Sequence, residues 1–206
     1  MVQTMLMDSQ TQTKNKLSYR EFLQKYTDVH AEWVDGEVIE LMTASDRHQN
    51  LVRWLIAVLS LFVESNNLGW LRPAPFNMQM PHINRGREPD ILFVCRERLD
   101  IVQSSHLSDA ADLVIEIVSP ESVGRDRGEK FVEYEAAGVR EYWLIDPDRQ
   151  QAEFYTLADD ERYRLLPTAD GVFRSKVLPD FWLEVAWFWQ EPLPKVLDVA
   201  RKLELL

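Results

Sequence analysis

The stretch from Glu88 to Pro147 decides the fold, because it contains two apolar segments that each carry an acid: EPDILFV (residues 88–94) and DLVIEIVSP (residues 112–120). Both segments are short, rich in β-branched residues and bounded by turn-forming residues, which is typical of buried strands. An ionised carboxylate in a buried strand is costly unless a cation or hydrogen bonds compensate it. Asp90 and Glu116 therefore need an explanation in structure or in chemistry.

A short predicted helix follows the second acidic strand and carries a cation, Lys130. The helix begins near Asp126 and ends at Ala137, and Gly138 stands where a left-handed helix cap is expected. The next segment, EYWLIDP (141–147), has the composition of a further strand.

The rest of the chain predicts a mixed α/β fold. Ser18 and Glu21 form a capping box that opens a short helix. Asp35-Gly36 is a strong hairpin signal, and apolar residues recur at helical spacing from 45 to 65. Further predicted elements are strands near 76–80, 154 and 163, and a helix over 192–205. The central order of helix, three strands, helix and strand predicts a mixed sheet flanked by helices, with an N-terminal hairpin and additional C-terminal strands.

The composition favours one domain. The chain has 206 residues, 46% of them hydrophobic, which is enough to bury one sizeable core. Residues 1–16 are expected to be a disordered tail and residues 17–206 a single domain. The longest apolar run, 54–63, is shorter than the ~20 residues that a membrane span needs. With no secretory signal and a single cysteine, Cys95, these features predict a cytoplasmic protein without a membrane segment.

The net charge of −11 argues against tight binding of nucleic acid, because an acidic surface repels a polyanion at long range. Bound divalent cations could reverse the charge locally. So could a basic face formed by Arg85, Arg87, Arg96, Arg98, Arg125 and Arg127. The charge therefore counts against a DNA-binding function without excluding metal-dependent hydrolysis.

Three longer blocks occur in the order WVDGEV (33–38), LVIEIVSP (113–120) and GVREYWLIDP (138–147). Together with Pro89-Asp90 and Lys130, they resemble the Uma2 family, also known as DUF820, of the PD-(D/E)XK restriction-endonuclease-like superfamily. The resemblance runs from about residue 17 to residue 193. It implies a restriction-endonuclease-like fold and a metal-dependent endonuclease that acts on DNA. It also implies that Asp90 and Glu116 bind the metal and that Lys130 orients the attacking water or stabilises the transition state.

The residues themselves favour Mg²⁺ or Mn²⁺, because two hard oxygen ligands at the ends of neighbouring strands suit these ions. The backbone carbonyl of Ile117 is a natural third ligand. A bound ion of this kind lowers the pKa of a coordinated water and polarises a phosphoryl oxygen. Lys130 would add a preorganised positive charge.

The position of the lysine departs from the usual superfamily pattern, which places it two residues after the acid on the same strand, where this chain has Val118. Lys130 can replace it only if the first turn of its helix packs against the strand ends, a migration that the superfamily tolerates. Asp126 and Lys130 stand four residues apart, so an intrahelical ion pair is the alternative. Asp126, with Glu129 three residues later, fits a helix N-cap.

Other residues are weaker candidates for the site. His48, near the start of the long helix, is either an accessory residue or a structural one. Glu40, at the end of the hairpin, is either a further metal ligand or a solvated strand residue. Glu88 is expected to be exposed, and Asp146 is expected to form the turn after its strand. We expect Tyr134 to pack against the wall of the cleft, with contact to the substrate as the alternative.

The C-terminal segments FWL (181–183) and WFW (187–189) are strongly aromatic, and we expect them to be buried against the sheet, with an exposed interface as the alternative. A homodimer is expected, because nucleases that cut two strands commonly present two active sites. The sequence thus favours an endonuclease that acts on DNA. The alternatives are a nuclease-fold interaction or regulatory module with weak or lost catalysis, and hydrolysis of RNA or another phosphodiester.

Overall fold

The two acidic segments lie on neighbouring strands of one mixed sheet. The structure is a computed structural model that describes residues 16–26, 29–42, 45–120 and 122–206. Within these ranges the helices are α1 (Tyr19–Lys25), α2 (Asp46–Ser65), α3 (Lys130–Ala137) and α4 (Val196–Lys202), with short helical turns η1 (Pro81–Ile83), η2 (Arg96–Ile101), η3 (Arg125–Glu129) and η4 (Val185–Trp189). The strands are β1 (Ala31–Val34), β2 (Glu37–Glu40), β3 (Gly69–Pro73), β4 (Asn77–Met80), β5 (Arg85–Arg87), β6 (Ile91–Cys95), β7 (His106–Leu107), β8 (Leu113–Ile117), β9 (Glu141–Asp146), β10 (Gln151–Leu157), β11 (Tyr163–Leu165), β12 (Val172–Arg174) and β13 (Trp182–Glu184). Apart from Lys16, the expected disordered tail lies outside the described residues.

The central sheet has the strand order β11-β10-β9-β8-β6-β3. Strands β8 and β9 run parallel and are joined by a crossover that contains η3 and α3, whereas β6 and β8 are antiparallel. A parallel pair requires such a crossover because its two strands point the same way. The predicted mixed sheet is therefore confirmed, and the crossover brings the helix of Lys130 back over the strand of Glu116.

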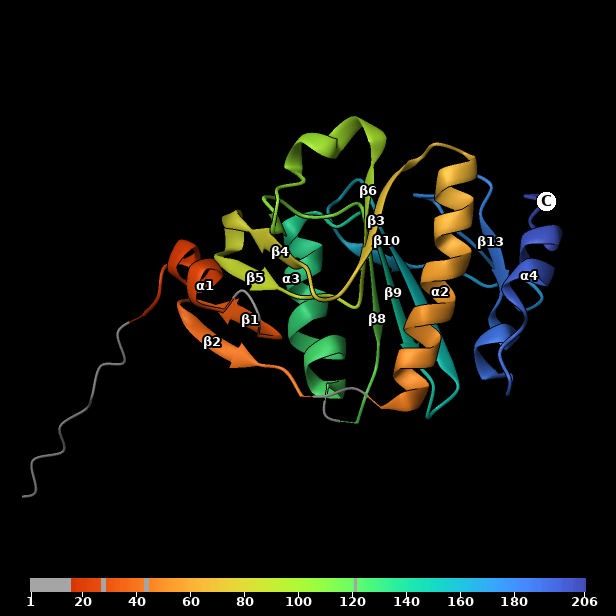
Figure 1. The fold of residues 1–206 in the computed structure, drawn as a ribbon, viewed down its shortest axis with the longest axis horizontal. Coiled ribbons are helices and arrows are strands. Elements are labelled where there is room, and N and C mark those ends of the chain that lie inside the picture. Colours follow the sequence, from red (N-terminus) through yellow and green to blue (C-terminus); the bar gives the residue numbers. More distant parts are fainter. Residues whose placement is uncertain (1–15, 27–28, 43–44, 121) are drawn as a thin grey trace, which may run out of the picture.

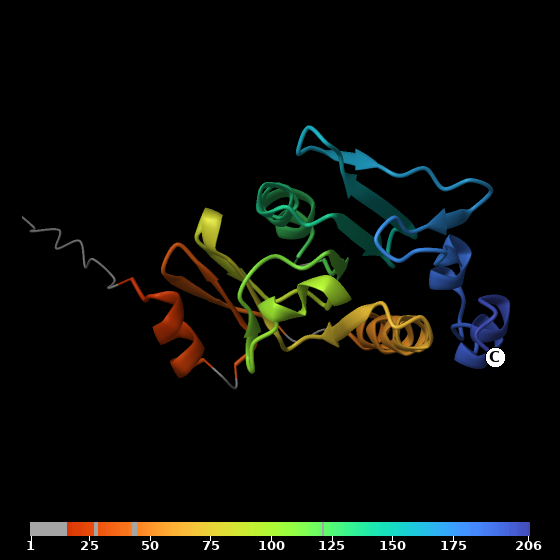
Figure 2. The same cartoon turned by 90° about the horizontal axis from the view of Figure 1, so that it is seen from above.

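Helices cover both faces of the central sheet, with α2 on one side and α3 on the other (Figures 1 and 2). Side chains alternate along β8, so Ile115 joins the apolar core beneath α2, whereas Val114 and Val118 join the core on the α3 side. By the same alternation Glu116 faces α3. Within the described ranges, none of the helices combines the length and the apolar character that crossing a membrane would need.

A second sheet, with the order β2-β1-β5-β4-β7, lies on the α3 side of the molecule (Figure 1). Its β1–β2 hairpin turns at Asp35 and Gly36, whose φ angles of 50° and 89° are the positive values that a tight two-residue turn needs. The predicted N-terminal hairpin is thus confirmed. Arg85 and Arg87 of β5 both form ion pairs with Glu133 of α3, so charged contacts attach this sheet to the helix.

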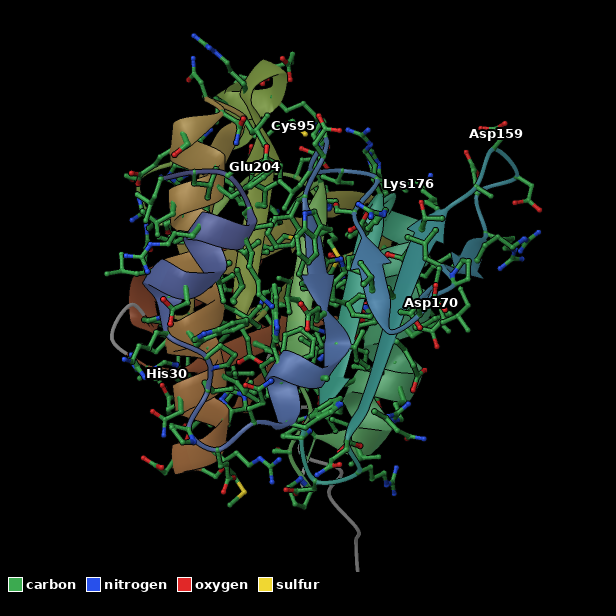
Figure 3. The ribbon with its side chains drawn as sticks, turned by 90° about the vertical axis from the view of Figure 1, so that its right-hand side faces the viewer. His30, Cys95, Asp159, Asp170, Lys176 and Glu204 are labelled. Carbon is green, nitrogen blue, oxygen red and sulfur yellow. The ribbon has the colours of Figure 1, made fainter. Side chains whose placement is uncertain are left out.

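Of the five C-terminal aromatic residues, Phe181, Trp187 and Phe188 are buried as expected, whereas Trp182 and Trp189 are partly buried and pack against the same core. Trp187 is 2% exposed and Phe188 is 1% exposed, and both belong to the apolar core beneath α2. Trp54 of α2 donates a 2.8 Å hydrogen bond to the carbonyl oxygen of Pro194. Figure 3, viewed from the side of α4, shows the C-terminal segment lying across α2. The C-terminal helix itself covers only Val196–Lys202 and is shorter than predicted.

The remaining local predictions are partly correct. The capping box is confirmed, because Ser18 Oγ accepts a 3.2 Å bond from the Glu21 N–H and the Ser18 N–H donates a 2.9 Å bond to Glu21 Oε2. The strand expected from Glu88 begins only at Ile91, so Asp90 precedes it. Strands β3, β5, β7, β12 and β13 were not predicted; four of them, β5, β7, β12 and β13, have only two or three residues, too few to show an alternating pattern.

Candidate active site

Asp90 lies just before β6 and is held by two contacts. Its Oδ2 accepts a 2.7 Å hydrogen bond from the Ile117 N–H of β8 and lies 3.1 Å from Nε2 of His48. His48 comes from the first turn of α2, where Ser45 Oγ accepts a 3.2 Å bond from the His48 N–H. Burial lowers the pKa of His48, but the hydrogen bond and the negative charge of Asp90 outweigh this effect and raise the pKa overall.

Glu116 is buried on the α3 face of β8, with 3% of its surface exposed. Its Oε1 accepts hydrogen bonds from Lys130 Nζ at 2.9 Å and from the Tyr134 hydroxyl at 2.7 Å. Burial raises the pKa of Glu116 to about 8, with Lys130 opposing the rise and the charges of Asp126 and Asp90 adding to it. Burial is thus the main reason that the pKa of Glu116 is raised, and the neighbouring acids add to it.

Lys130 is the first residue of α3, and its ammonium group reaches three carboxylates. Nζ lies 2.9 Å from Glu116 Oε1, 3.1 Å from Glu32 Oε1 and 3.4 Å from Asp126 Oδ1. Burial lowers the pKa of Lys130, but these acids raise it well above its usual value. Lys130 thus carries a fixed positive charge beside Glu116.

Val118, at the position where the superfamily pattern has lysine, is 3% exposed and belongs to the apolar core on the α3 side. A lysine at that position would have to place its ammonium group within that core. The cation is supplied instead from α3, the helix that packs over this part of the strand. Lys130 was expected to replace the usual lysine only if the first turn of its helix packs against the acidic strand. The contact of Lys130, in the first turn of α3, with Glu116 of β8 meets this condition.

These side chains line one cavity of about 360 Å³. Of the sequence-predicted residues, its lining contains Asp90, Glu116, Ile117, Lys130 and His48. Glu40 is the exception, because it ends β2, is exposed and does not reach this lining. A larger cavity of about 480 Å³ lies between α2 and residues 190–196, but the acids in its wall are exposed, so it lacks the buried charge of the first cavity.

Two expectations about neighbouring acids are wrong. Asp126 is not a helix N-cap: it lies inside η3, whose N-cap is Gly124, and its buried carboxylate faces Lys130. Glu88 is not exposed, because only 5% of its surface is accessible and its Oε1 lies 2.7 Å from His30 Nδ1. Both residues line the cavity, so the site is more acidic than the sequence suggested.

Tyr134 and Asp146 lie as the sequence predicted. Tyr134 is 0% exposed and packs as expected, and its hydroxyl in addition donates to Glu116. Asp146 ends β9 and accepts a 3.0 Å hydrogen bond from the Arg149 N–H, which is the contact of a turn residue. Tyr134 therefore fixes the same oxygen of Glu116 that Lys130 contacts.

A charged cluster of the buried Glu32 and Arg87 and the partly buried Glu133 lies next to Lys130 and was not predicted. Glu32 and Arg87 are both 0% exposed, and Arg87 Nη1 lies 2.7 Å from Glu32 Oε2. Arg87 Nε also lies 2.7 Å from Glu133 Oε2. Glu32 thus bridges Arg87 and Lys130 and limits where the ammonium group can lie. The sequence offers no local signal for this contact, because its members come from β1, β5 and α3.

The predicted basic face does not exist as a surface. Arg87 is fully buried, and Arg85, Arg98 and Arg127 form ion pairs with acids of the chain. Among the six arginines named above, Arg96 and Arg125 have no ion pair within the described residues. Most of the positive charge expected at the surface is therefore already neutralised.

The donor chemistry of the cavity fits a divalent cation. Among the described residues, Asp90 Oδ1 and Glu116 Oε2 make no hydrogen bond, so each carboxylate keeps one oxygen for a further partner. The Ile117 N–H points to Asp90, and the carbonyl of the same strand residue faces the same edge. The part of the chain that is described contains no cluster of three or more His, Cys, Asp or Glu side chains arranged to enclose a metal. Mg²⁺ needs no such cage, since it usually keeps several waters and binds through one or two carboxylates.

Comparison with known proteins identifies a family and a fold. The sequence model of the Uma2 family, described as "Putative restriction endonuclease", matches residues 19–186. Among solved structures, the chain is similar to a DUF820 protein of Anabaena variabilis that is described as a "putative nuclease". That similarity has a TM-score of 0.69 and 18% sequence identity and covers 84% of this chain and 97% of the other. No curated protein matches the chain. The structural similarity establishes the fold.

Proposed function

This chain belongs to the Uma2 family of restriction-endonuclease-like proteins, and we propose that it is a metal-dependent endonuclease that hydrolyses phosphodiester bonds in DNA. The observation that carries the proposal is the position of Lys130 Nζ, 2.9 Å from Glu116 Oε1 in the cavity that Asp90 also lines. Two carboxylates and a lysine on separate elements are brought to one cavity in a fold shared with a nuclease-like neighbour. The ion pair of Lys130 and Glu116, without Asp90 in the same cavity, would be an ordinary structural contact.

Asp90, Glu116 and the Ile117 carbonyl are the groups that would hold Mg²⁺ or Mn²⁺. When bound, such an ion lowers the pKa of a water molecule and polarises a phosphoryl oxygen. His48 and the Ile117 N–H both contact Oδ2 of Asp90, which orients the carboxylate, and no described residue makes a hydrogen bond to Oδ1. Tyr134 does the same for Glu116 by donating to Oε1. The protein thereby fixes the orientation of both acids before any ligand arrives.

Lys130 is proposed to orient the attacking water or to stabilise negative charge on the pentavalent transition state. Its ammonium group is held by Glu32 at 3.1 Å and Asp126 at 3.4 Å, so it requires little reorganisation during the reaction. The same acids keep it protonated, which makes it a poor general base and a good electrostatic donor.

The proposal is tested by incubating the purified protein with supercoiled, linear and single-stranded DNA and with RNA, in the presence of Mg²⁺, Mn²⁺ or EDTA. We expect the wild-type protein to cleave DNA and EDTA to abolish the cleavage. The variants Glu116→Ala and Lys130→Ala should both be inactive. Glu40→Ala is the matched control, because it removes an exposed acid outside the cavity. If the wild-type protein leaves every substrate intact with either metal, the proposal is wrong and an interaction module with a nuclease fold is favoured. Cleavage of RNA alone would correct the substrate.

The proposal includes a cytoplasmic homodimer that presents one cavity to each strand of a duplex. Sedimentation velocity of the purified protein measures this directly. A monomer at all concentrations, with and without DNA, would contradict the dimer and leave the chemistry of a single cavity unaffected.

A further inference from the structure

Arg125 differs from the other cations that line the cavity. Lys130 contacts three carboxylates, His48 contacts Asp90, and His30 contacts Glu88. Arg125 lines the same cavity, and among the described residues it has neither an ion pair nor a hydrogen bond from its guanidinium group. It is therefore the cation of the described lining whose charge the protein leaves available.

The local position of Arg125 makes this lack of a partner meaningful. Arg125 is the first residue of η3, and its side chain is partly buried in the cavity wall. Its Nε is buried and has no hydrogen-bond partner. A donor removed from water without a partner costs free energy, and native structures usually satisfy such groups or reserve them for a ligand.

Arg127, two residues further along the same turn, provides the contrast. Its Nε is likewise buried without a hydrogen-bond partner among the described residues, but its terminal nitrogens pair with Asp146 and Glu153 of neighbouring strands, so its charge is used within the fold. Acids are thus within reach of this turn, yet none of the described acids contacts Arg125. Arg125 lines the cavity, whereas Arg127 does not belong to its lining.

The negative charge of the cavity lining makes an available cation important for binding an anionic substrate. Four carboxylates line it, from Glu88, Asp90, Glu116 and Asp126, and they repel an entering phosphodiester. A guanidinium group binds phosphate through two parallel hydrogen bonds and stays charged at all relevant pH values. We propose that Arg125 binds a backbone phosphate of the DNA strand that enters the cavity. This inference rests on the proposed nuclease function and adds to it the residue that holds the substrate.

The test measures binding separately from cleavage. A fluorescein-labelled short DNA duplex is titrated with the wild-type protein, Arg125→Gln, Arg125→Lys and Arg174→Gln, in EDTA, over a series of salt concentrations. Arg174 is the matched control, because it is exposed on β12, has no ion pair among the described residues and lies outside the cavity lining. Cleavage with Mg²⁺ is then measured to obtain kcat and KM for each protein.

For Arg125→Gln we expect a dissociation constant raised about tenfold, whatever the DNA sequence, and a salt slope reduced by about 0.9, as for the loss of one phosphate contact. KM should rise more than kcat falls. Arg125→Lys should keep the salt slope and recover only part of the affinity, because lysine keeps the charge without the two-pronged geometry. Arg174→Gln should match the wild-type protein.

The inference is overturned if Arg125→Gln and Arg174→Gln bind DNA equally well, or if the wild-type protein does not bind DNA at all. The proposed nuclease function fails on a different result, the absence of cleavage with Mg²⁺ or Mn²⁺. A wild-type protein that cleaves DNA while Arg125→Gln keeps its KM would reject the inference and retain the nuclease.

Discussion

Two buried glutamates on neighbouring strands of the central sheet, Glu116 of β8 and Glu141 of β9, are treated differently by the fold. Glu141 is 0% exposed, and both of its oxygens accept hydrogen bonds. The donors are Trp143 Nε1 at 2.6 Å, Ser175 Oγ at 2.8 Å, Lys176 N at 2.6 Å and Val177 N at 3.1 Å. This carboxylate ties the segment after β12 to β9 and has a structural role.

Glu116 is nearly as buried, but its two hydrogen bonds both fall on Oε1, and Oε2 has none among the described residues. Burial raises the pKa of both glutamates, so a raised pKa alone does not distinguish them. What distinguishes them is the oxygen that remains free next to a cavity. A buried acid whose bonds are complete stabilises the fold, whereas one with an unused oxygen is held for a partner from outside.

The largest expected effect is on the activity of Glu116→Gln. The amide keeps the shape of the side chain and removes the negative charge that would bind the metal. Cleavage of supercoiled DNA should fall on the order of 1,000-fold, the size of effect seen when a preorganised charge is removed from an active site. The initial rate with Mg²⁺ measures it, and a variant that retains a tenth of the wild-type rate would contradict the role of Glu116.

The next effect is that of Lys130→Met, which removes the charge shared by Glu32, Glu116 and Asp126. The rate should fall about 100-fold, and the free energy of unfolding should drop by about 3 kcal/mol, because buried acids lose their partner. Urea denaturation separates the two effects. Adding Asp126→Asn should recover part of the stability and none of the activity, because Asp126 has no ion pair other than that with Lys130 among the described residues. Recovery of activity in the double variant would show that Lys130 acts only through the fold.

Glu141→Gln should show the reverse pattern. The substitution replaces one accepting oxygen by an NH2 group, which cannot accept the hydrogen bonds that this oxygen receives. The free energy of unfolding should therefore fall by ~1–3 kcal/mol. The cleavage rate, measured well below the melting temperature, should stay within a factor of two or so of the wild-type rate, since this residue does not belong to the cavity lining. A loss of activity equal to that of Glu116→Gln would remove the contrast between the two acids.

The smallest effect is a pH dependence of stability in the absence of divalent cations. Burial raises the pKa of Glu116 in the folded protein to about 8, whereas in the unfolded chain its pKa is the ordinary glutamate value of about 4.5. Between these values the folded state binds more protons, so Glu116 makes stability fall as pH rises. Glu116→Gln should show a shallower decline in melting temperature from pH 5 to pH 8 than the wild-type protein. Identical slopes would mean that Glu116 is ionised throughout.

The sequence was sufficient for the features that have local signals. Alternation and β-branched composition predicted the central strands, and Asp35-Gly36 predicted the hairpin. Acids in apolar segments marked Asp90 and Glu116, because such a residue is costly without compensation. Lys130 followed from the family pattern together with a short helix in the right place.

The remaining features depend on tertiary packing and could not be predicted. Glu32 and Arg87 are 55 positions apart on short strands, and only the assembled second sheet brings them together next to Lys130. The charge of Glu88 predicted an exposed residue, but Glu88 is buried because His30, from a distant segment, contacts its carboxylate. The N-cap pattern at Asp126 failed because helical geometry already begins before that residue.

The most direct test of the central claim is X-ray diffraction from crystals soaked in Mn²⁺, with anomalous scattering used to locate the metal. The unused oxygens of Asp90 and Glu116 predict a single strong peak between these two carboxylates and the Ile117 carbonyl, and its loss in Glu116→Gln but not in Glu141→Gln. No peak at saturating Mn²⁺, or a peak elsewhere with this cavity empty, would contradict the claim that the free oxygen of Glu116 is held for a metal.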